Sequence, residues 1–309
     1  MTRAWRALAL PLALAACAGP TTTAQQVQPI PNPLPAPVVA VRPAPPVLDT
    51  DFRFRGALVQ GGMAIGQAPA ATKRLTMDGR ALRIDPQSRF LIAFGRDHVS
   101  TVTVEATLAD GTRLRSLVPV APRSWKIERI PSLRQNLTRN PEYDRLREAE
   151  LAQIRAARAR ASDATGWTER FIWPATGRVS GIYGSQRILG GVPMNFHGGV
   201  DVARPTGTPV VAPASGIIAL AADKPFSLEG NLLLIDHGNQ LFSAFLHLSR
   251  IDVKVGDRVA QGQRVGAIGR TGRATGPHLH WGLTWGELRI DPELLVPPMR
   301  PDAPVEAAR

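Results

Sequence analysis

Residues 276–281 read G-P-H-L-H-W, and the spacing of the two histidines constrains the C-terminal third of the chain. His278 and His280 are two positions apart, and side chains two apart on a strand project from the same face. An extended backbone here therefore points both imidazoles into one cleft. The preceding G-R-T-G-R-A-T-G, residues 269–276, lacks the G-K-[ST] ending of a phosphate loop, so it is expected to be a turn that leads into this strand.

Three more residues of the same third can join this pair. H-G-G-V-D supplies His197 and Asp201, and F-L-H-L-S supplies His247. Paired glycines on both sides of His197 disfavour a helix and favour a loop that enters a strand. Imidazole and carboxylate suit Zn²⁺, and three protein ligands with a fourth position left open characterise a catalytic zinc site. The pattern predicts a zinc hydrolase.

The spacing H-x-x-x-D followed downstream by H-x-H resembles the signature of the lysostaphin or LytM type of zinc peptidoglycan endopeptidase. The resemblance covers residues 170 to 296. It extends to G-V-D-V-A-R-P-T-G-T-P-V-V-A-P-A-S-G after the first half and V-G-D-R-V-A-Q-G-Q-R-V-G-A-I-G-R-T-G before the second. It implies an antiparallel β-sheet peptidase domain, expected at 168–298, with Zn²⁺ as cofactor and peptidoglycan as substrate.

Carried over residue by residue, the resemblance makes His197, Asp201 and His280 the metal ligands. His247 and His278 fall on the two other histidines that line the active site. One of them would accept a proton from the attacking water, and the pair would stabilise the oxyanion or protonate the leaving amine. The sequence leaves open which of the two is the base.

The expected activity is hydrolysis of peptide cross-links in the bacterial cell wall. The alternative is a LytM domain that activates cell-wall amidases without hydrolysing anything, and a third is a structural wall-tethering lipoprotein. Activators of that kind typically lack part of the metal site, whereas all five residues are present here, which favours the enzyme. The sequence does not tell which peptide bond would be cut, nor the oligomeric state.

Other zinc chemistries and other histidines fit the pattern less well. The chain lacks H-E-x-x-H, and its single cysteine excludes a Cys-rich structural zinc site. His98 and His237 are interpreted as surface or hydrogen-bonded core histidines. A turn signal of Gly and Asn follows His237 between two apolar runs, which predicts the tip of a hairpin.

The N-terminus predicts export. Arg3 and Arg6 precede a short apolar run, too short for the roughly 20 residues of a membrane-spanning helix, so residues 1–17 are expected to be a signal peptide. The run ends in L-A-A-C, which resembles a bacterial lipobox with Cys17 as the lipidated residue, although an ordinary cleavage site would also fit. The resemblance implies a periplasmic lipoprotein anchored to the outer membrane.

Composition divides the rest of the chain, which is expected to be mainly β. A Pro-rich tether at 18–48 precedes a small β-sandwich-like domain at 49–130, which is predicted from period-two patterning and Asp-Gly turns. A helical linker is expected at 136–163, with its helix starting at Pro141 and an apolar stripe of Leu146, Leu151, Ile154 and Ala157. A disordered tail is expected at 299–309.

Charge and the linker helix leave open what else the chain contacts. The formal net charge of +12 favours anionic polymers or membrane surfaces. Peptidoglycan, the membrane and other cell-wall enzymes are therefore candidate partners, and no nucleic-acid motif occurs. The arginines of the predicted helix are interpreted as a solvated face. The helix could also lie across the catalytic groove, where it would inhibit the enzyme.

Overall fold

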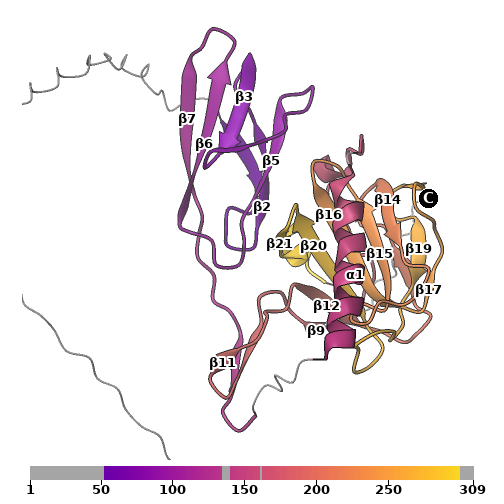
Figure 1. The fold of residues 1–309 in the computed structure, drawn as a ribbon. Coiled ribbons are helices and arrows are strands. Elements are labelled where there is room, and N and C mark those ends of the chain that lie inside the picture. The colour runs from indigo at the N-terminus through magenta and orange to yellow at the C-terminus, as the bar shows by residue number, and fades with distance from the viewer. Residues whose placement is uncertain (1–51, 134–139, 161, 300–309) are drawn as a thin grey trace, which may run out of the picture. The chain divides into compact units, whose positions relative to one another are not determined.

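The computed structural model describes residues 52–133, 140–160 and 162–299. The predicted signal peptide at 1–17 with its Cys17, the predicted tether at 18–48 and the segment 300–309 lie outside these residues. The described residues belong to one compact unit in which strands predominate, so the mainly β fold class is confirmed (Figure 1). No described helix is both long enough and apolar enough to cross a membrane.

Two antiparallel sheets form the N-terminal part. One sheet has the order β1 (Arg53–Gly56), β2 (Met63–Gln67), β5 (Arg89–Ala93), and the other has the order β4 (Arg80–Ala81), β3 (Thr72–Met77), β6 (Thr101–Leu108), β7 (Arg113–Pro119). Strand β6 has the predicted period-two pattern, because Val102, Val104 and Ala106 are buried and alternate with more accessible residues. Their side chains join Phe90 and Ile92 of β5 in one apolar cluster. This part is the predicted sandwich-like domain.

An eight-stranded antiparallel sheet dominates the C-terminal part. Its order is β18 (Arg258–Val259), β14 (Gly216–Ala221), β15 (Asn231–Asp236), β16 (Leu241–Leu248), β20 (Leu279–Trp285), β12 (Gly199–Ala203), β9 (Arg178–Gly181), with β21 (Leu288–Ile290) paired to β20. A smaller sheet has the order β13 (Pro209–Val211), β19 (Arg264–Ala267), β17 (Arg250–Ile251). Short 3₁₀ helices cover Gly166–Thr168 (η1) and Pro292–Leu295 (η2).

A third small sheet ties the segment before the linker helix to the peptidase part. It has the order β11 (Val192–Pro193), β10 (Gln186–Leu189), β8 (Ile127–Ile130). Strand β8 runs parallel to β10 and adds to the edge of the β10–β11 hairpin. This hairpin precedes His197, so the upstream chain is hydrogen-bonded to the segment that leads into the candidate site.

The two faces of the large sheet have different roles. Phe245 of β16 and Trp281 of β20 are opposite one another and are both fully buried in the core. The next pair, Leu246 and His280, projects from the other face, since directly opposite residues of an antiparallel pair share a face. One face therefore builds the core, and the other carries His280.

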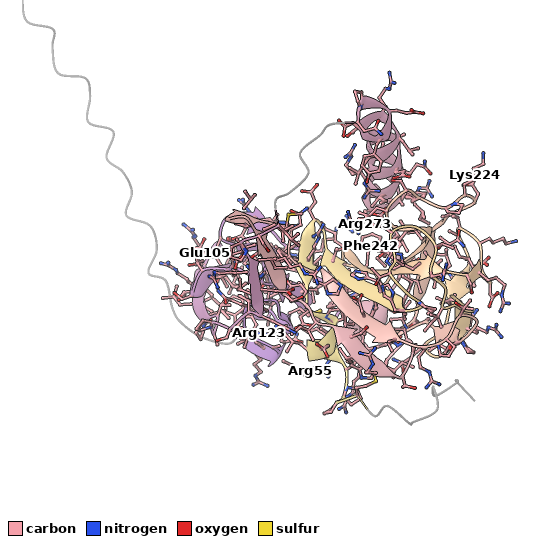
Figure 2. The ribbon with its side chains drawn as sticks, turned by 90° about the horizontal axis from the view of Figure 1, so that it is seen from below. Arg55, Glu105, Arg123, Lys224, Phe242 and Arg273 are labelled. Carbon is pink, nitrogen blue, oxygen red and sulfur yellow. The ribbon has the colours of Figure 1, made fainter. Side chains whose placement is uncertain are left out.

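Helix α1 (Pro141–Ala159) covers part of the face that carries His280. Asn140 caps its start by accepting hydrogen bonds from two backbone N–H groups. Ile154 and Ala157 of α1 pack with Phe242 and Ala244 of β16, and Phe242 lies at the foot of the helix in Figure 2. The helix is shorter than the predicted linker.

The predicted apolar stripe is only partly correct. Leu146 is 52% exposed, and the buried residues of the helix are Glu150, Ile154 and Ala157. The reason is polar: the Glu150 carboxylate accepts hydrogen bonds from the backbone N–H and hydroxyl of Ser227. A buried carboxylate with such partners replaces an apolar contact in this half of the helix.

His237 makes stability depend on pH. It is fully buried, its two ring nitrogens contact the Ser215 carbonyl and the Ser243 hydroxyl, and burial lowers its pKa to about 4. The unfolded chain, with a histidine pKa of about 6.5, therefore binds more protons between pH 6.5 and 4. We expect the free energy of unfolding to decrease by about 3 kcal/mol from this residue as the pH falls through that window.

Urea unfolding of the wild type and of His237→Gln, at pH 7 and at pH 4, measures this contribution. The amide retains a donor and an acceptor but does not titrate. The variant should therefore lose less stability than the wild type on acidification. Equal losses in the two proteins would contradict the prediction.

Candidate metal centre

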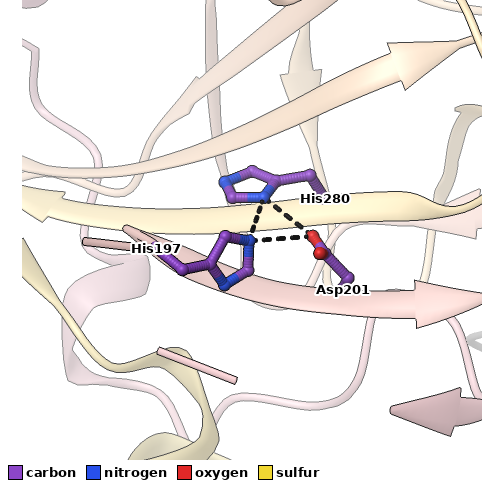
Figure 3. Close-up of side chains that lie close together, drawn as sticks. All are labelled: His197, Asp201 and His280. Carbon is purple, nitrogen blue, oxygen red and sulfur yellow. Dashed lines mark hydrogen bonds and ion pairs between the residues drawn. The ribbon is translucent and has the colours of Figure 1, made fainter. Parts of the chain in front are cut away.

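Three side chains from two paired strands and one loop converge on the face of the large sheet opposite Phe245 and Trp281. Asp201 of β12 is directly opposite His280 of β20, and His197 enters from the loop before β12. Asp201 Oδ1 lies 2.9 Å from His280 Nδ1 and 3.1 Å from His197 Nε2, and the two imidazole nitrogens are 3.0 Å apart (Figure 3). The structure thus brings the three predicted ligands together at one point.

These atoms fit a zinc ion. Bonds of about 2.0–2.1 Å in a tetrahedral site separate neighbouring ligand atoms by about 3.3 Å. The observed separations of 2.9 to 3.1 Å are close to that edge. Two imidazole nitrogens and one carboxylate oxygen are also a donor set typical of zinc, and they leave one tetrahedral position open.

The protonation states of two of the three residues, Asp201 and His280, suit cation binding. Burial would raise the pKa of the Asp201 carboxyl, but hydrogen bonds from His197 and His280 outweigh burial and hold this pKa well below its usual range. Burial lowers the pKa of His280. Burial also acts to lower the pKa of His197, but the hydrogen bond to Asp201, the charge of that carboxylate and the contacts with the Ile182 and Gly199 backbone together raise it. A charged carboxylate and a neutral His280 imidazole are the forms that bind a metal.

The loop that carries His197 is held by backbone and by the upstream domain. His197 Nδ1 donates to the Ile182 carbonyl at 3.1 Å, which leaves Nε2 free to face the centre. Gly184 N–H donates to the His197 carbonyl, and the Gly184 carbonyl accepts from Arg96 Nε at 2.9 Å. The Arg96 guanidinium is buried between the rings of Trp125 and Phe196. A residue of the sandwich domain therefore supports the loop.

Gly181 leaves the space that Asp201 occupies. A Cβ at this position would lie 2.3 Å from Asp201 Oδ2 and 3.1 Å from His197 Cε1. We expect Gly181→Ala to displace both side chains and to weaken zinc binding by roughly 10- to 100-fold, the range for changes in the groups around a ligand. Competition with a chromophoric chelator measures the Kd. An unchanged Kd for zinc would contradict the prediction, since it would mean that Asp201 and His197 keep their positions beside the added methyl group.

His247 and His278 lie beside the three converging residues. Their ring centroids are 4.8 Å apart, and His278 Nε2 is 3.8 Å from Asp201 Oδ1. The Nδ1 of His247 donates to the Thr271 carbonyl, and the Nδ1 of His278 donates to the Gly276 carbonyl, both at 2.8 Å. Each ring therefore keeps Nε2 as its proton acceptor. Burial lowers the pKa of His247 to about 4, so this ring is neutral at neutral pH.

The other histidines are elsewhere. His237 is the fully buried core residue described above, and His98 lies in the sandwich domain, where its ring is 5.4 Å from that of Phe94. Among the described residues, neither histidine lies close enough to His197, Asp201 and His280 to share a metal ion with them.

Sequence reasoning missed the groups that orient the site. The carbonyls of Ile182 and Thr271 set the tautomers of His197 and His247, and backbone groups carry no residue-type signal. Arg96 was not singled out either, because nothing in R-D-H-V distinguishes it from the other arginines. Only Thr271 had an indirect signal, since it belongs to the glycine-rich turn before the H-x-H strand.

Comparison with known proteins agrees with this geometry. The model of peptidase family M23 matches residues 195–292. ShyA of Vibrio cholerae, named a peptidoglycan DD-endopeptidase, is 47% identical over 87 residues, which are 28% of this chain and 20% of ShyA. The catalytic domain of lysostaphin from Staphylococcus simulans is 32% identical, with 43% of this chain and 96% of that chain covered and a TM-score of 0.31. Residues 195–292 form a domain of peptidase family M23.

The M23 match contains all five site residues, and together with the identity to ShyA it confirms the predicted peptidase family. A crystal structure from Pseudomonas aeruginosa assigned to peptidase M23 has a TM-score of 0.57 at 28% identity, and covers 77% of this chain and 94% of that chain. The sandwich domain and α1 lie outside the residues matched by the family model. The chain spans about a fifth of the length of ShyA. Membership of this metallopeptidase family implies a metal.

Proposed function

We propose that this M23 peptidase is a zinc-dependent endopeptidase that hydrolyses peptide cross-links of bacterial peptidoglycan. The observation that carries the proposal is the convergence of His197, Asp201 and His280 at 2.9 to 3.1 Å, with two further histidines beside them. The identity to ShyA, which is named for cleavage of peptidoglycan, supports the substrate class.

In this proposal His197, Asp201 and His280 hold the zinc. Bound zinc supplies Lewis-acid chemistry that activates water and polarises the scissile carbonyl. His247 and His278 present Nε2 atoms whose protonation is set by backbone carbonyls, so either can accept the proton that water loses. The water oxygen would bond to the carbonyl carbon, the C–N bond would break as the tetrahedral adduct collapses, and the proton would pass to the leaving amine.

Digestion of purified cross-linked peptidoglycan tests the proposal. The purified protein is incubated with zinc beside His280→Ala, and the released muropeptides are identified by mass. Release of un-cross-linked peptides by the wild type alone would establish the activity and name the bond. A preparation that holds one zinc per chain and releases nothing would refute hydrolysis and favour the activator of cell-wall amidases.

We also propose that the protein works outside the cytoplasm, where its substrate lies. The proposal rests on the predicted signal peptide and on Cys17 as a lipid anchor, which both lie outside the described residues. Labelling of the cells with a radioactive fatty acid, with Cys17→Ala as control, tests the anchor. Contacts with other cell-wall enzymes remain a prediction.

A further inference from the structure

The backbone of His247 has an unusual conformation. Its φ is +64°, a left-handed value that non-glycine residues rarely adopt. Between Phe245 and Leu248 the pairing with β15 shifts register, so that β16 has one more residue than its partner strand. Regular alternation would turn His247 away from the face that carries Leu246 and His280. The bulge instead places its ring 4.8 Å from that of His278.

A loop between β14 and β15 holds this backbone. The backbone N–H of His247 donates to the Glu229 carbonyl at 2.8 Å, and Phe226 and Gly230 close the loop by two mutual backbone hydrogen bonds. The N–H of Arg273 donates to the Leu228 carbonyl of the same loop. Because a left-handed residue persists only where its surroundings impose it, the position of this loop decides the position of the His247 ring.

Helix α1 is attached to that loop by charge. Both terminal nitrogens of Arg147 contact the Glu229 carboxylate, each at 2.6 Å, in the two-bond geometry that is strongest for this pair. Arg147 also contacts Glu150 at 2.9 Å, and Glu150 accepts from the N–H and hydroxyl of Ser227. The side chains of Arg147, Glu150 and Glu229 are 17%, 6% and 11% exposed. This is a buried network and not a solvated face.

We propose that Arg147 is a positioning residue for the site: through the Glu229 ion pair, α1 holds the loop that keeps His247 in its left-handed conformation beside His278. The linker helix is then a support of the active site, although it lies outside the family match. The proposal rests on the proposed function for its catalytic meaning. The contacts that it names can be measured without activity.

The opposite role for α1 is an inhibitory cover, since the helix packs on the sheet face that carries His280. The two roles predict opposite changes in turnover when the contact between the helix and the site is loosened. Loosening a support lowers turnover, whereas loosening a cover raises it. The buried network favours the support, because it ends on the residue whose carbonyl accepts from His247.

The experiment compares Arg147→Met with Arg155→Met in the full chain. Arg155 is on the same helix, and its one ion pair among the described residues is with the exposed Glu148, so it controls for loss of an arginine and of an ion pair. Hydrogen–deuterium exchange follows the backbone amide of His247, because its hydrogen bond to the Glu229 carbonyl is the contact that joins the loop to His247. We expect Arg147→Met to speed this exchange at least about tenfold, with the Phe245 amide unchanged. Equal exchange in both variants would overturn the proposal.

Kinetics on a soluble cross-linked muropeptide gives the second readout. We expect Arg147→Met to lower kcat about tenfold with KM and zinc content unchanged, and Arg147→Lys to recover part of the loss. In a His247→Ala background the same change should have less than about a twofold effect, because the residue acts through His247. A rise in kcat would overturn the proposal in favour of the cover. If the wild type hydrolyses nothing, the proposed function fails. The exchange result alone then decides whether Arg147 holds the His247 backbone through Glu229.

Discussion

Replacing His280 with alanine is expected to abolish both zinc binding and hydrolysis. The His280 side chain is 15% exposed, and its Nδ1 is 2.9 Å from Asp201 and 3.0 Å from His197, so its loss removes one of three converging donors. Zinc chemistry supplies several kcal/mol of transition-state stabilisation. At 1.36 kcal/mol per factor of ten, its loss should reduce kcat/KM by about 10³-fold or more.

Metal analysis after dialysis and muropeptide release measure the two effects together. His98→Ala is the matched control, because it removes a histidine that lies outside the ligand group. It should retain zinc and activity. An His280→Ala protein that binds zinc as tightly as the wild type would exclude His280 as a ligand, and one that retains activity would exclude the metal mechanism.

Replacing His247 with alanine is expected to lower kcat by about 10²- to 10⁴-fold while zinc content stays the same. Its ring lies 4.8 Å from that of His278, and Nδ1 donates to the Thr271 carbonyl, so the free Nε2 can exchange a proton in the cleft. Because burial lowers its pKa to about 4, His247 is neutral above that value and takes up a proton below it. Its capacity to accept a proton should therefore be lost only as the pH falls through about 4.

Rate measurements with the wild type, His247→Ala and His278→Ala, each loaded with zinc, identify the proton acceptor. The histidine whose removal costs more in kcat, with an unchanged Kd for zinc, is assigned as the base. A His247→Ala protein with full kcat would contradict a role in proton transfer and would leave His278 as the candidate.

Several features could be predicted from the sequence because they depend on neighbours in the chain. Period-two patterning correctly predicted the sandwich-like domain, where Val102 and Val104 are buried. The interval between His278 and His280 predicted that their side chains lie together, and both rings approach Asp201 Oδ1 in the structure. Pro141 correctly predicted where the helix begins. These signals are local, since a strand period or a helix start follows from a few adjacent residues.

The features that sequence reasoning did not find depend on distant contacts. Alternation along β16 places His247 on the wrong face, and only the bulge against β15 corrects it. Arg147 and Glu229 are 82 positions apart in the chain, so no local pattern links them and the sequence indicates only a solvated face. Arg96 supports the His197 loop from another domain.

The order of residues alone therefore predicted the kind of chemistry, because ligand types and their spacing depend on covalent neighbours. The sequence predicts His197, Asp201 and His280 as the candidate ligands. Their convergence within 2.9 to 3.1 Å, and the orientation of His247, required the folded chain. The physical reason is that strand pairing, burial and a left-handed backbone are set by contacts between segments that the sequence keeps apart, and such contacts leave no local pattern.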